Sequence, residues 1–351
     1  MTKIKFGDVI TINPKEKLPK GTLAPKVAME GIQPFTKYIS SYVFEEYAGG
    51  AKFRNGDTLL ARITPSLENG KTSIVSELPT DSVGFGSTEF LVFRATNQIL
   101  PDYLYYLTTT PNFRDMAIKS MTGTSGRQRV QTDVVSDYEL NLPSIKQQKL
   151  IVDKLLPLDA KIRLNNQIND NLVALAGTIW RSFDVYESKE VHDLFDVKYG
   201  KTMPKTQLTS TGVPVFGANG MIGYTDKAVM LPDYSVVITS RGSGSGDVQL
   251  MDKGVFVTNN LLTLESKHPQ ANWTTWQMLE QANIQGAVTG SAQPQLTIEN
   301  FGRVVVNIPD KDTIKKFNGV SEKFEQIYWA NKNEIKLLIE TRDTILRKLI
   351  G

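Results

Sequence analysis

The sequence of 351 residues contains no cysteine and only two histidines, His192 and His268. The missing thiols exclude disulfide bonds, a thiolate nucleophile and a cysteine-ligated zinc or iron–sulfur site, and two isolated histidines make a histidine-rich metal site implausible. No run of about 18 apolar residues occurs, and the segment 1–8 lacks the apolar core of a secretion signal. We therefore expect a cytoplasmic protein that does not associate with membranes.

Charge composition indicates little about the partner of this chain. There are 40 Lys and Arg residues against 37 Asp and Glu, which leaves a net charge of +3. So small an excess does not by itself indicate nucleic-acid binding. Residues 186–309 carry nine Lys and Arg against eleven Asp and Glu, a net charge of −2. A nucleic-acid site in that region would have to gather its positive charge on one face.

An internal repeat of about 166 residues organises the chain. Thr122 and Thr289 each open a Thr-Gly-small turn, which leads through an acidic residue to a short apolar strand ending in Asn-Leu-Pro or Asn-Ile-Pro. The two prolines, Pro143 and Pro309, lie 166 residues apart, and a long helical pattern follows each. The repeat predicts an α+β fold in which two tandem domains are each followed by one helix. Upstream, two strand-like runs match more loosely, residues 57–63 and 233–239.

Both helical patterns place seam residues alternately four and three positions apart over four or more heptads. This spacing is typical of a coiled coil. Asn165 and Asn331 occupy equivalent places in the two seams, where a polar residue can fix the register of a helix pair. The alternative is two unrelated amphipathic helices, each docked on its own domain. The predicted seam residues are Leu158, Ile162, Asn165, Leu172, Ile179, Phe324, Tyr328, Asn331, Leu338 and Ile345.

These patterns divide the chain into four segments. Pro157 lies inside the first helical pattern and predicts a kink or an interruption near Leu156, so that the helix proper begins at Leu158. The predicted segments are a first domain at 1–143, a central helix at 144–185, a second domain at 186–309 and a C-terminal helix at 310–351.

The junction after the first domain reads Leu142-Pro-Ser-Ile-Lys-Gln-Gln-Lys-Leu-Ile-Val and continues with Leu158-Asp-Ala-Lys-Ile. This run resembles the central conserved region of the specificity subunit of type I restriction-modification enzymes. The second junction, Ile308-Pro-Asp-Lys-Asp-Thr-Ile, lacks the Gln pair and matches less well. The resemblance extends over essentially the whole chain. It implies two target-recognition domains separated by two long helices that form an antiparallel coiled coil with pseudo-two-fold symmetry.

The resemblance also implies a function. A protein of this family is a non-catalytic subunit that binds double-stranded DNA sequence-specifically. Each recognition domain would read one half of a bipartite, gapped target, and the subunit would position two methyltransferase subunits together with endonuclease–translocase subunits. No cofactor is then expected on this chain, whereas S-adenosylmethionine, ATP and Mg²⁺ are expected on the partner subunits.

In the first domain, two loops rich in Gly, Ser and Thr carry side chains suited to DNA. Arg and Lys bind phosphates and guanine edges, and Asn and Gln read adenine. An alternative role for Arg127 and Arg129 is to pair with surface carboxylates such as Asp133. The predicted DNA contacts are Arg62, Thr64, Lys71, Ser125, Arg127 and Arg129.

In the second domain, the corresponding loops are a Gly/Ser-rich segment, an Asn pair and a loop with two glutamines. A turn-capping role is an alternative for Asn259 and Asn260. Lys201 is equally compatible with a solvated loop lysine. The predicted DNA contacts are Lys201, Ser240, Arg241, Ser243, Asn259, Asn260, Gln293 and Gln295.

Other functions are less well supported by the residues. The glycines at 242–246 imitate a nucleotide-binding loop, but the following residues favour a strand where such a loop requires a helix. No Asn-Pro-Pro-Tyr or Asp-Pro-Pro-Tyr motif of an amino-methyltransferase occurs. The aromatic clusters at 103–106 and 273–276 are interpreted as core. The alternatives to a recognition subunit are a self-contained restriction nuclease or methyltransferase and a two-domain scaffold that does not bind DNA.

Overall fold

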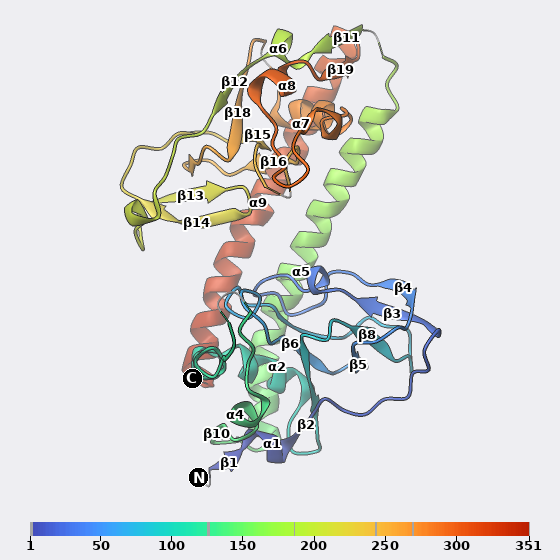
Figure 1. Ribbon diagram of the computed structural model, residues 1–351, viewed down its shortest axis with the longest axis vertical. Helices are drawn as coiled ribbons and strands as arrows, with labels where there is room; N and C mark the ends of the chain where they lie inside the picture. The colour runs from blue at the N-terminus through green and yellow to red at the C-terminus, as the bar shows by residue number, and fades with distance from the viewer. Residues whose placement is uncertain (1–2, 125–126, 186, 243, 269, 351) are drawn as a thin grey trace. The chain divides into compact units, whose positions relative to one another are not determined.

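The computed structural model describes residues 3–124, 127–185, 187–242, 244–268 and 270–350. The chain forms two compact units, which are described separately. Unit 1 comprises residues 1–166 and 332–351, and unit 2 comprises residues 167–331. The two long helices, α5 (Ile145–Arg181) and α9 (Lys311–Leu349), each contribute one part to each unit (Figure 1).

The described residues of unit 1 form two four-stranded sheets and one two-stranded pair. The first sheet has the strand order β2-β9-β6-β7 and is antiparallel throughout, whereas the second, β4-β3-β8-β5, contains one parallel pair, β3 with β8. Its strands are β1 (Ile4–Lys5), β2 (Ile10–Ile12), β3 (Leu23–Val27), β4 (Val43–Glu46), β5 (Ala51–Phe53), β6 (Thr58–Ala61), β7 (Thr72–Ile74), β8 (Gly84–Gly86), β9 (Phe90–Ala95) and β10 (Glu139–Leu140). Its shorter helices are α1 (Phe6–Val9), η1 (Met29–Gly31), α2 (Pro101–Thr109), α3 (Pro111–Lys119) and α4 (Thr132–Ser136).

Unit 2 repeats this plan, except that its second sheet has three strands in place of four. Its main sheet has the order β12-β18-β15-β16, and a three-stranded sheet, β14-β13-β17, again contains one parallel pair. Its strands are β11 (Glu187–Glu190), β12 (Phe195–Tyr199), β13 (Val213–Gly217), β14 (Gly220–Thr225), β15 (Ser235–Thr239), β16 (Val248–Met251), β17 (Phe256–Val257), β18 (Leu261–Ser266) and β19 (Val305–Ile308). Its shorter helices are α6 (Val191–Leu194), η2 (Lys205–Gln207), α7 (Asn272–Glu280), η3 (Gln285–Ala287) and α8 (Ile298–Gly302).

The two units therefore share one topology. The strands β2, β9, β6 and β7 of unit 1 correspond in order to β12, β18, β15 and β16 of unit 2, and the terminal pair β1–β10 corresponds to β11–β19. In each unit this terminal pair joins the first strand of the domain to its last strand, which lies just before a long helix begins. This correspondence confirms the predicted repeat of two α+β domains, and it makes equivalent positions in the two domains identifiable from strand register.

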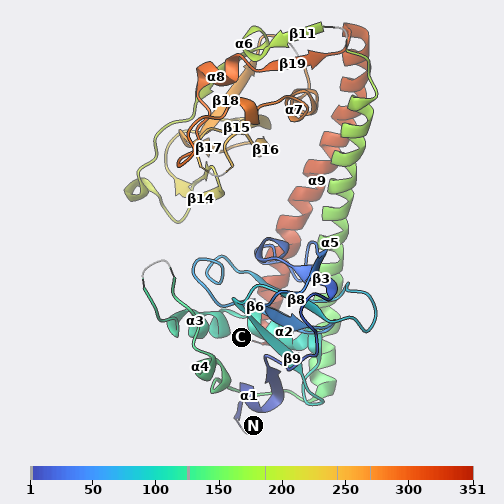
Figure 2. The same cartoon turned by 45° about the vertical axis from the view of Figure 1, so that its right-hand side comes forward.

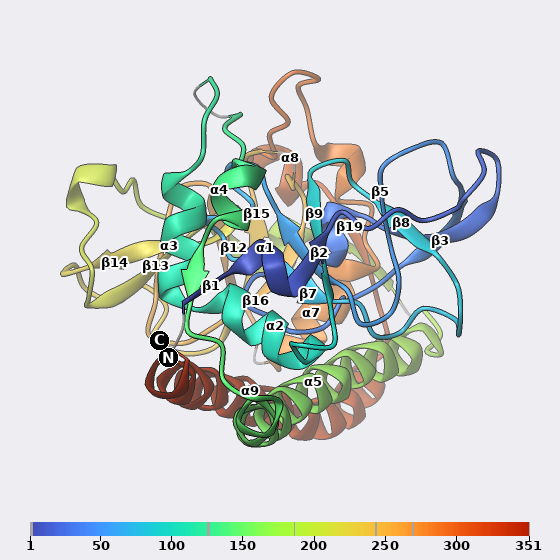
Figure 3. The ribbon, with the colours of Figure 1, turned by 90° about the horizontal axis from the view of Figure 1, so that it is seen from below.

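The aromatic clusters of α2 and α7 belong to the core, as predicted. Tyr103 and Trp273 are buried. Helix α2 lies beside α5 in unit 1 (Figure 3), where the Tyr106 hydroxyl donates to Asp159 of α5 at 2.5 Å. Helix α7 lies beside α9 in unit 2 (Figure 2), where Thr274 hydrogen-bonds Asn318. In each domain, one short aromatic helix thus contacts a long helix through a side-chain hydrogen bond.

The predicted interruption of the first long helix at Pro157 is wrong, because α5 is continuous from Ile145 to Arg181. A proline inside a helix removes one N–H donor and strains the preceding turn. Here Leu155 is packed into the core of unit 1, and the buried Gln148 donates to the carbonyls of Gln98 and Pro143. These tertiary contacts hold the turns before the proline in helical conformation.

Within each unit the parts of α5 and α9 pair antiparallel. In unit 2, Asn331 donates to Asn169 at 2.9 Å, while Trp180, further along α5, stacks edge-on against Phe317, nearer the start of α9. In unit 1, Asn165 donates to Glu334 at 2.7 Å. None of the ten predicted seam residues is exposed. The two seam asparagines do not bond each other, since each contacts a different residue of the opposite helix.

The asparagine pair of unit 2 carries a testable prediction. Asn331→Leu is expected to lower the free energy of unfolding by about 1–3 kcal/mol, because it leaves the buried Asn169 carbonyl oxygen without its donor. Asn169→Leu together with Asn331→Leu is expected to recover most of that loss, since neither amide is then left unpaired. Denaturant unfolding of the four members of this double-mutant cycle measures both values. Equal destabilisation by the single and the double change would contradict the assignment.

Candidate functional site

Three backbone segments of unit 1 meet at the end of strand β6. Arg62, the residue after β6, donates its N–H to the carbonyl of Glu89 at 2.9 Å and accepts the N–H of Val130 at 2.9 Å. Arg129 and Thr122 exchange two backbone hydrogen bonds, which close the loop that follows α3. Two of the predicted DNA-contacting loops are thereby joined, and we call this place the loop junction of the first domain.

An ion-pair cluster occupies this loop junction. Arg129 donates from Nε and Nη2 to both carboxylate oxygens of Glu89, at 2.6–3.0 Å, and Arg62 Nε lies 3.4 Å from the same carboxylate. The Arg129 hydrogen bonds hold the pKa of Glu89 below its ordinary value despite its partial burial. The carboxylate that Arg129 binds is Glu89 and not Asp133, which sequence reasoning named as an alternative partner.

The remaining predicted contacts of the first domain lie around this cluster. Thr64 donates to the Glu68 carboxylate at 3.0 Å, and Lys71 donates to the Met29 carbonyl at 2.9 Å. Both side chains therefore have internal partners. Arg127 is exposed in the loop after α3. Ser125 lies outside the described residues.

An open depression adjoins the loop junction of the first domain. Its volume is about 630 Å³, and Lys15, Lys52, Arg62 and Thr88 are among the residues that line it. Glu16, the acidic residue in its lining, is already bound to Arg54 and Arg94. Three basic side chains thus face a concave surface beside the Arg62–Glu89–Arg129 cluster.

The same three segments meet in unit 2. Ser240, the residue after β15, donates its N–H to the carbonyl of Asn260 at 2.8 Å and accepts the N–H of Leu296 at 2.8 Å. Gln295 and Thr289 exchange two backbone hydrogen bonds, as Arg129 and Thr122 do in unit 1. This loop junction of the second domain brings together the Gly/Ser-rich segment, the Asn pair and the loop with two glutamines, in which DNA contacts were predicted.

The side chains at the second junction differ in how far they are exposed to solvent, and therefore in whether they can contact DNA. Ser240 is fully buried and donates its hydroxyl to the Leu296 carbonyl at 2.9 Å, so we leave its side chain out of the proposed interface. Arg241 and Gln293 are exposed, and Asn260 and Gln295 are half-buried.

The remaining predictions for the second domain concern the turn before β18 and a loop lysine. Asn259 forms the turn before β18 together with Asn260, which is compatible with the turn-capping alternative. Lys201 is exposed, and its backbone pairs with the end of β17. Ser243 lies outside the described residues.

Glu89 is the residue of this site that sequence reasoning missed. It lies in a two-residue turn directly before β9, at the place that Asn260 occupies before β18. The repeated Thr-Gly turns and the Asn-Leu-Pro and Asn-Ile-Pro junctions lie far from it in the sequence. An alignment of the apolar runs at 90–95 and 261–266 is the signal that would have identified it.

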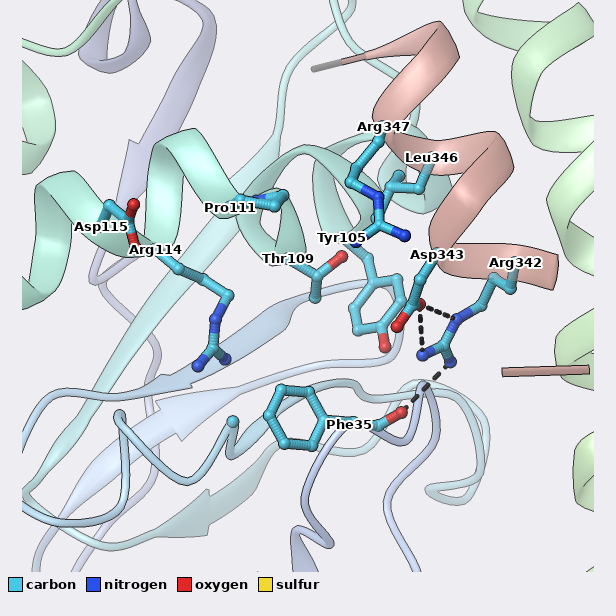
Figure 4. A pocket seen from close by; sticks show the side chains of 11 residues that line it. Phe35, Tyr105, Thr109, Pro111, Arg114, Asp115, Arg342, Asp343, Leu346 and Arg347 are labelled. Carbon is cyan, nitrogen blue, oxygen red and sulfur yellow. Dashed lines mark hydrogen bonds and ion pairs between the residues drawn. The ribbon is translucent and has the colours of Figure 1, made fainter. Parts of the chain in front are cut away.

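A second polar cluster lies at the end of α9 in unit 1. Arg342 donates to Asp159 of α5 at 2.9 Å. It also donates to the carbonyl of Phe35 at 3.1 Å and pairs with Asp343 (Figure 4). Burial by itself would lower the pKa of Arg342, but Asp159, Tyr105 and Asp343 together outweigh this effect and raise the pKa above its ordinary value. Burial, reinforced by Asp159, also raises the pKa of Tyr106. The Arg342 cluster therefore joins both long helices to the first domain.

A cavity beside the Arg342 cluster is lined by side chains of both charge signs. This cavity of about 210 Å³ is lined by Phe35, Tyr105, Arg114 and Arg347 together with Asp115 and Asp343 (Figure 4). The Arg114 guanidinium lies 5.0 Å from the centre of the Phe35 ring. Nothing in this lining selects one sign of charge, so its role is interpreted as structural.

Among the described residues, no helix is both long and apolar enough to cross a membrane. Over the same part of the chain, no group of three or more His, Asp or Glu side chains is arranged to hold a metal ion.

Comparisons with known proteins agree with the fold and with the resemblance in the sequence. A family model described as the type I restriction modification DNA specificity domain matches residues 1–174 and 184–337. The chain is 32% identical over 130 residues to the EcoAI type I restriction enzyme specificity subunit of Escherichia coli, and 33% identical over 147 residues to the HindI specificity subunit of Haemophilus influenzae. These alignments cover 35% and 40% of this chain but only 22% and 31% of those two relatives.

A solved structure has the same fold over the whole length. It is the S subunit of a type I restriction-modification system from M. genitalium, with a TM-score of 0.51 and 16% sequence identity. The comparison covers 100% of this chain and 96% of that chain. The fold of two repeated α+β domains and two long helices is therefore shared with that S subunit.

Proposed function

Because this chain belongs to the type I restriction modification DNA specificity family, we propose that it is the DNA-recognition subunit of a type I restriction-modification complex. Each domain reads one half of a bipartite, gapped target in double-stranded DNA. The observation that supports this most directly is the repeated loop junction. Two domains of the same topology place Arg62 and Arg129 in one case, and Asn260 and Gln295 in the other, on the same backbone frame. These are the side-chain types that read guanine and adenine edges.

The proposal includes the partners of the chain. A repeated domain followed each time by a long helix offers two equivalent attachment surfaces, which suits two methyltransferase subunits, and endonuclease–translocase subunits then join this complex. The chain itself is proposed to be non-catalytic and to carry no cofactor. S-adenosylmethionine, ATP and Mg²⁺ are bound by the partner subunits, and the complex acts on DNA in the cytoplasm.

The test is to retain DNA from a randomised duplex pool on the full chain co-expressed with its methyltransferase subunit, and to sequence what is retained. A motif of two short elements with a constant gap is the expected result. Retention of DNA without any motif, or of no DNA, would contradict the proposed function and favour a scaffold. Cleavage by the chain alone with Mg²⁺, or its binding of S-adenosylmethionine, would favour the enzyme alternatives.

Arg127 provides a mutational prediction. Arg127→Ala is expected to weaken or relax recognition of one half-site only, because this exposed side chain belongs to the first domain. If it contacts a phosphate, the slope of log affinity against log salt concentration falls by about 1. Binding titrations at several salt concentrations, on duplexes altered in one half or the other, measure both effects. Arg303→Ala is the matched control, since Arg303 is also exposed and pairs with Glu299 on α8. An equal loss on both half-sites would count against the assignment of Arg127.

A further inference from the structure

Strand register identifies which side chains are equivalent at the two loop junctions. In unit 1, Ala61 pairs with Phe90, and in unit 2, Thr239 pairs with Leu261. The next residues after β6 and β15 make the same two backbone hydrogen bonds to their neighbouring segments. The three equivalent pairs are Arg62 with Ser240, Glu89 with Asn260, and Arg129 with Gln295.

The backbone at these positions is constant while the side-chain chemistry changes completely. The first domain has two cations and one anion there, and the second domain has a hydroxyl and two amides. A structural role would tolerate or require similar residues in both copies of one fold. A change of chemistry on a retained frame is what two domains need when they read different bases.

The geometry of the first junction orients Arg129 for one kind of base. A guanidinium has five N–H donors in a planar fork. Glu89 takes the N–H of Nε and one N–H of Nη2, so the edge formed by Nη1 and the second N–H of Nη2 remains. That edge matches the O6 and N7 acceptors of guanine. The Arg129 side chain is 44% exposed and the Glu89 side chain 19%, so the carboxylate lies behind the arginine as a support.

The second junction presents amides in place of this fork. Asn260 and Gln295 are half-buried, and within the described residues neither side chain makes a hydrogen bond. An amide offers one donor and one acceptor side by side, which matches the N7 acceptor and the N6 donor of adenine. The second junction therefore has unused hydrogen-bonding groups of the type that selects adenine.

We infer that two of these equivalent positions, Glu89 with Asn260 and Arg129 with Gln295, determine the base specificity of each domain. Arg129, positioned by Glu89, reads a guanine in one half of the target, and Asn260 with Gln295 reads an adenine in the other half. The inference rests on the proposed function. Glu89 is a positioning residue that acts through Arg129, and it does not itself contact the base.

The test uses the full chain in complex with its methyltransferase subunit, and it sequences the DNA retained from a randomised duplex pool. Arg129→Gln is expected to reduce the preference for one guanine by about 10- to 100-fold and to leave the other half of the motif unchanged. Glu89→Gln is expected to reduce the same preference to a smaller degree, because a neutral amide makes weaker hydrogen bonds to a guanidinium. Glu89→Asp, which keeps the charge, is expected to restore part of it.

A gain-of-function variant keeps the test independent of folding defects. Asn260→Glu combined with Gln295→Arg transfers the first chemistry to the second domain and is expected to change an adenine to a guanine in the second half only. Glu45→Gln and Arg303→Gln are matched controls, because Glu45 pairs with Lys26, and Arg303 with Glu299, at exposed places away from the junctions. Both controls are expected to retain the wild-type motif.

Two negative results are distinguishable. A bipartite motif that stays the same in Arg129→Gln and in the combined Asn260→Glu and Gln295→Arg variant would overturn the inference and leave the proposed function intact. If the wild-type chain selects no motif at all, the proposed function itself fails.

Discussion

Replacing Arg342 with methionine is expected to lower the free energy of unfolding by about 3–5 kcal/mol. The side chains of Arg342 and Asp159 are 6% and 2% exposed, and they form an ion pair at 2.9 Å. Removing the cation leaves the Asp159 carboxylate buried, with the Tyr106 hydroxyl as its remaining hydrogen-bond donor among the described residues. An unpaired buried charge costs more than the pair contributes, because the charge has lost its solvation without compensation. The change also releases the end of α9 from the loop at Phe35.

Denaturant unfolding followed by circular dichroism measures this effect. Arg342→Met combined with Asp159→Leu is expected to be much less harmful, because no charge is then left unpaired. Lys149→Met is the surface control. It removes an exposed ion pair with Asp153 and is expected to change stability by less than about 1 kcal/mol. A loss below about 1 kcal/mol for Arg342→Met would show that the Arg342 cluster does not hold α9 to the first domain.

Trp273→Ala is expected to have an effect of similar size in unit 2, a loss of about 3–5 kcal/mol. The indole is 0% exposed, and its ring centre lies 5.6 Å from that of Trp276, 6.1 Å from Phe324 and 5.7 Å from Tyr328. Two of these neighbours belong to α9. The substitution therefore creates a cavity at the place where α7 joins the second domain to the long helix.

Thermal and denaturant unfolding measure this loss of stability, and two further variants serve as comparisons. Trp273→Phe is expected to cost less, because most of the ring volume is retained. Leu337→Ala removes an exposed apolar side chain of α9 and is expected to change stability by less than about 0.5 kcal/mol. Similar values for Trp273→Ala and Leu337→Ala would contradict the role given to α7.

The upstream part of the repeat shows what a sequence pattern can and cannot determine about strands. The runs at 57–63 and 233–239 do correspond, as β6 and β15. However, hydrogen bonding equates Ala61 with Thr239, whereas the sequence match had equated Ile63 with Thr239. A strand pattern repeats every two residues, so a shift of two leaves every side chain on its own face. Only the pairing with β9 and β18 removes that ambiguity.

The loop junctions show the same difference between what the sequence indicates and what only the tertiary structure determines. Arg62, Arg129, Asn260 and Gln295 were identified from residue type and from their loops, and the structure brings them together in two equivalent places. Glu89 was not identified, because an acidic residue in a short turn has no DNA-binding signal of its own. The burial of Ser240 was not predicted either, since a serine in a Gly/Ser-rich loop is ordinarily expected to be exposed.

The sequence by itself determined the two tandem α+β domains, the two long seam-bearing helices and the family to which they belong. These features depend on repeats, heptad spacing and local motifs, which are properties of neighbouring residues along the chain. Tertiary structure alone decided that α5 continues through Pro157, that Asn331 bonds Asn169, and that Glu89 supports Arg129. Each of these depends on groups that are distant in sequence, and their contact energies are settled only when the strands and helices are packed together.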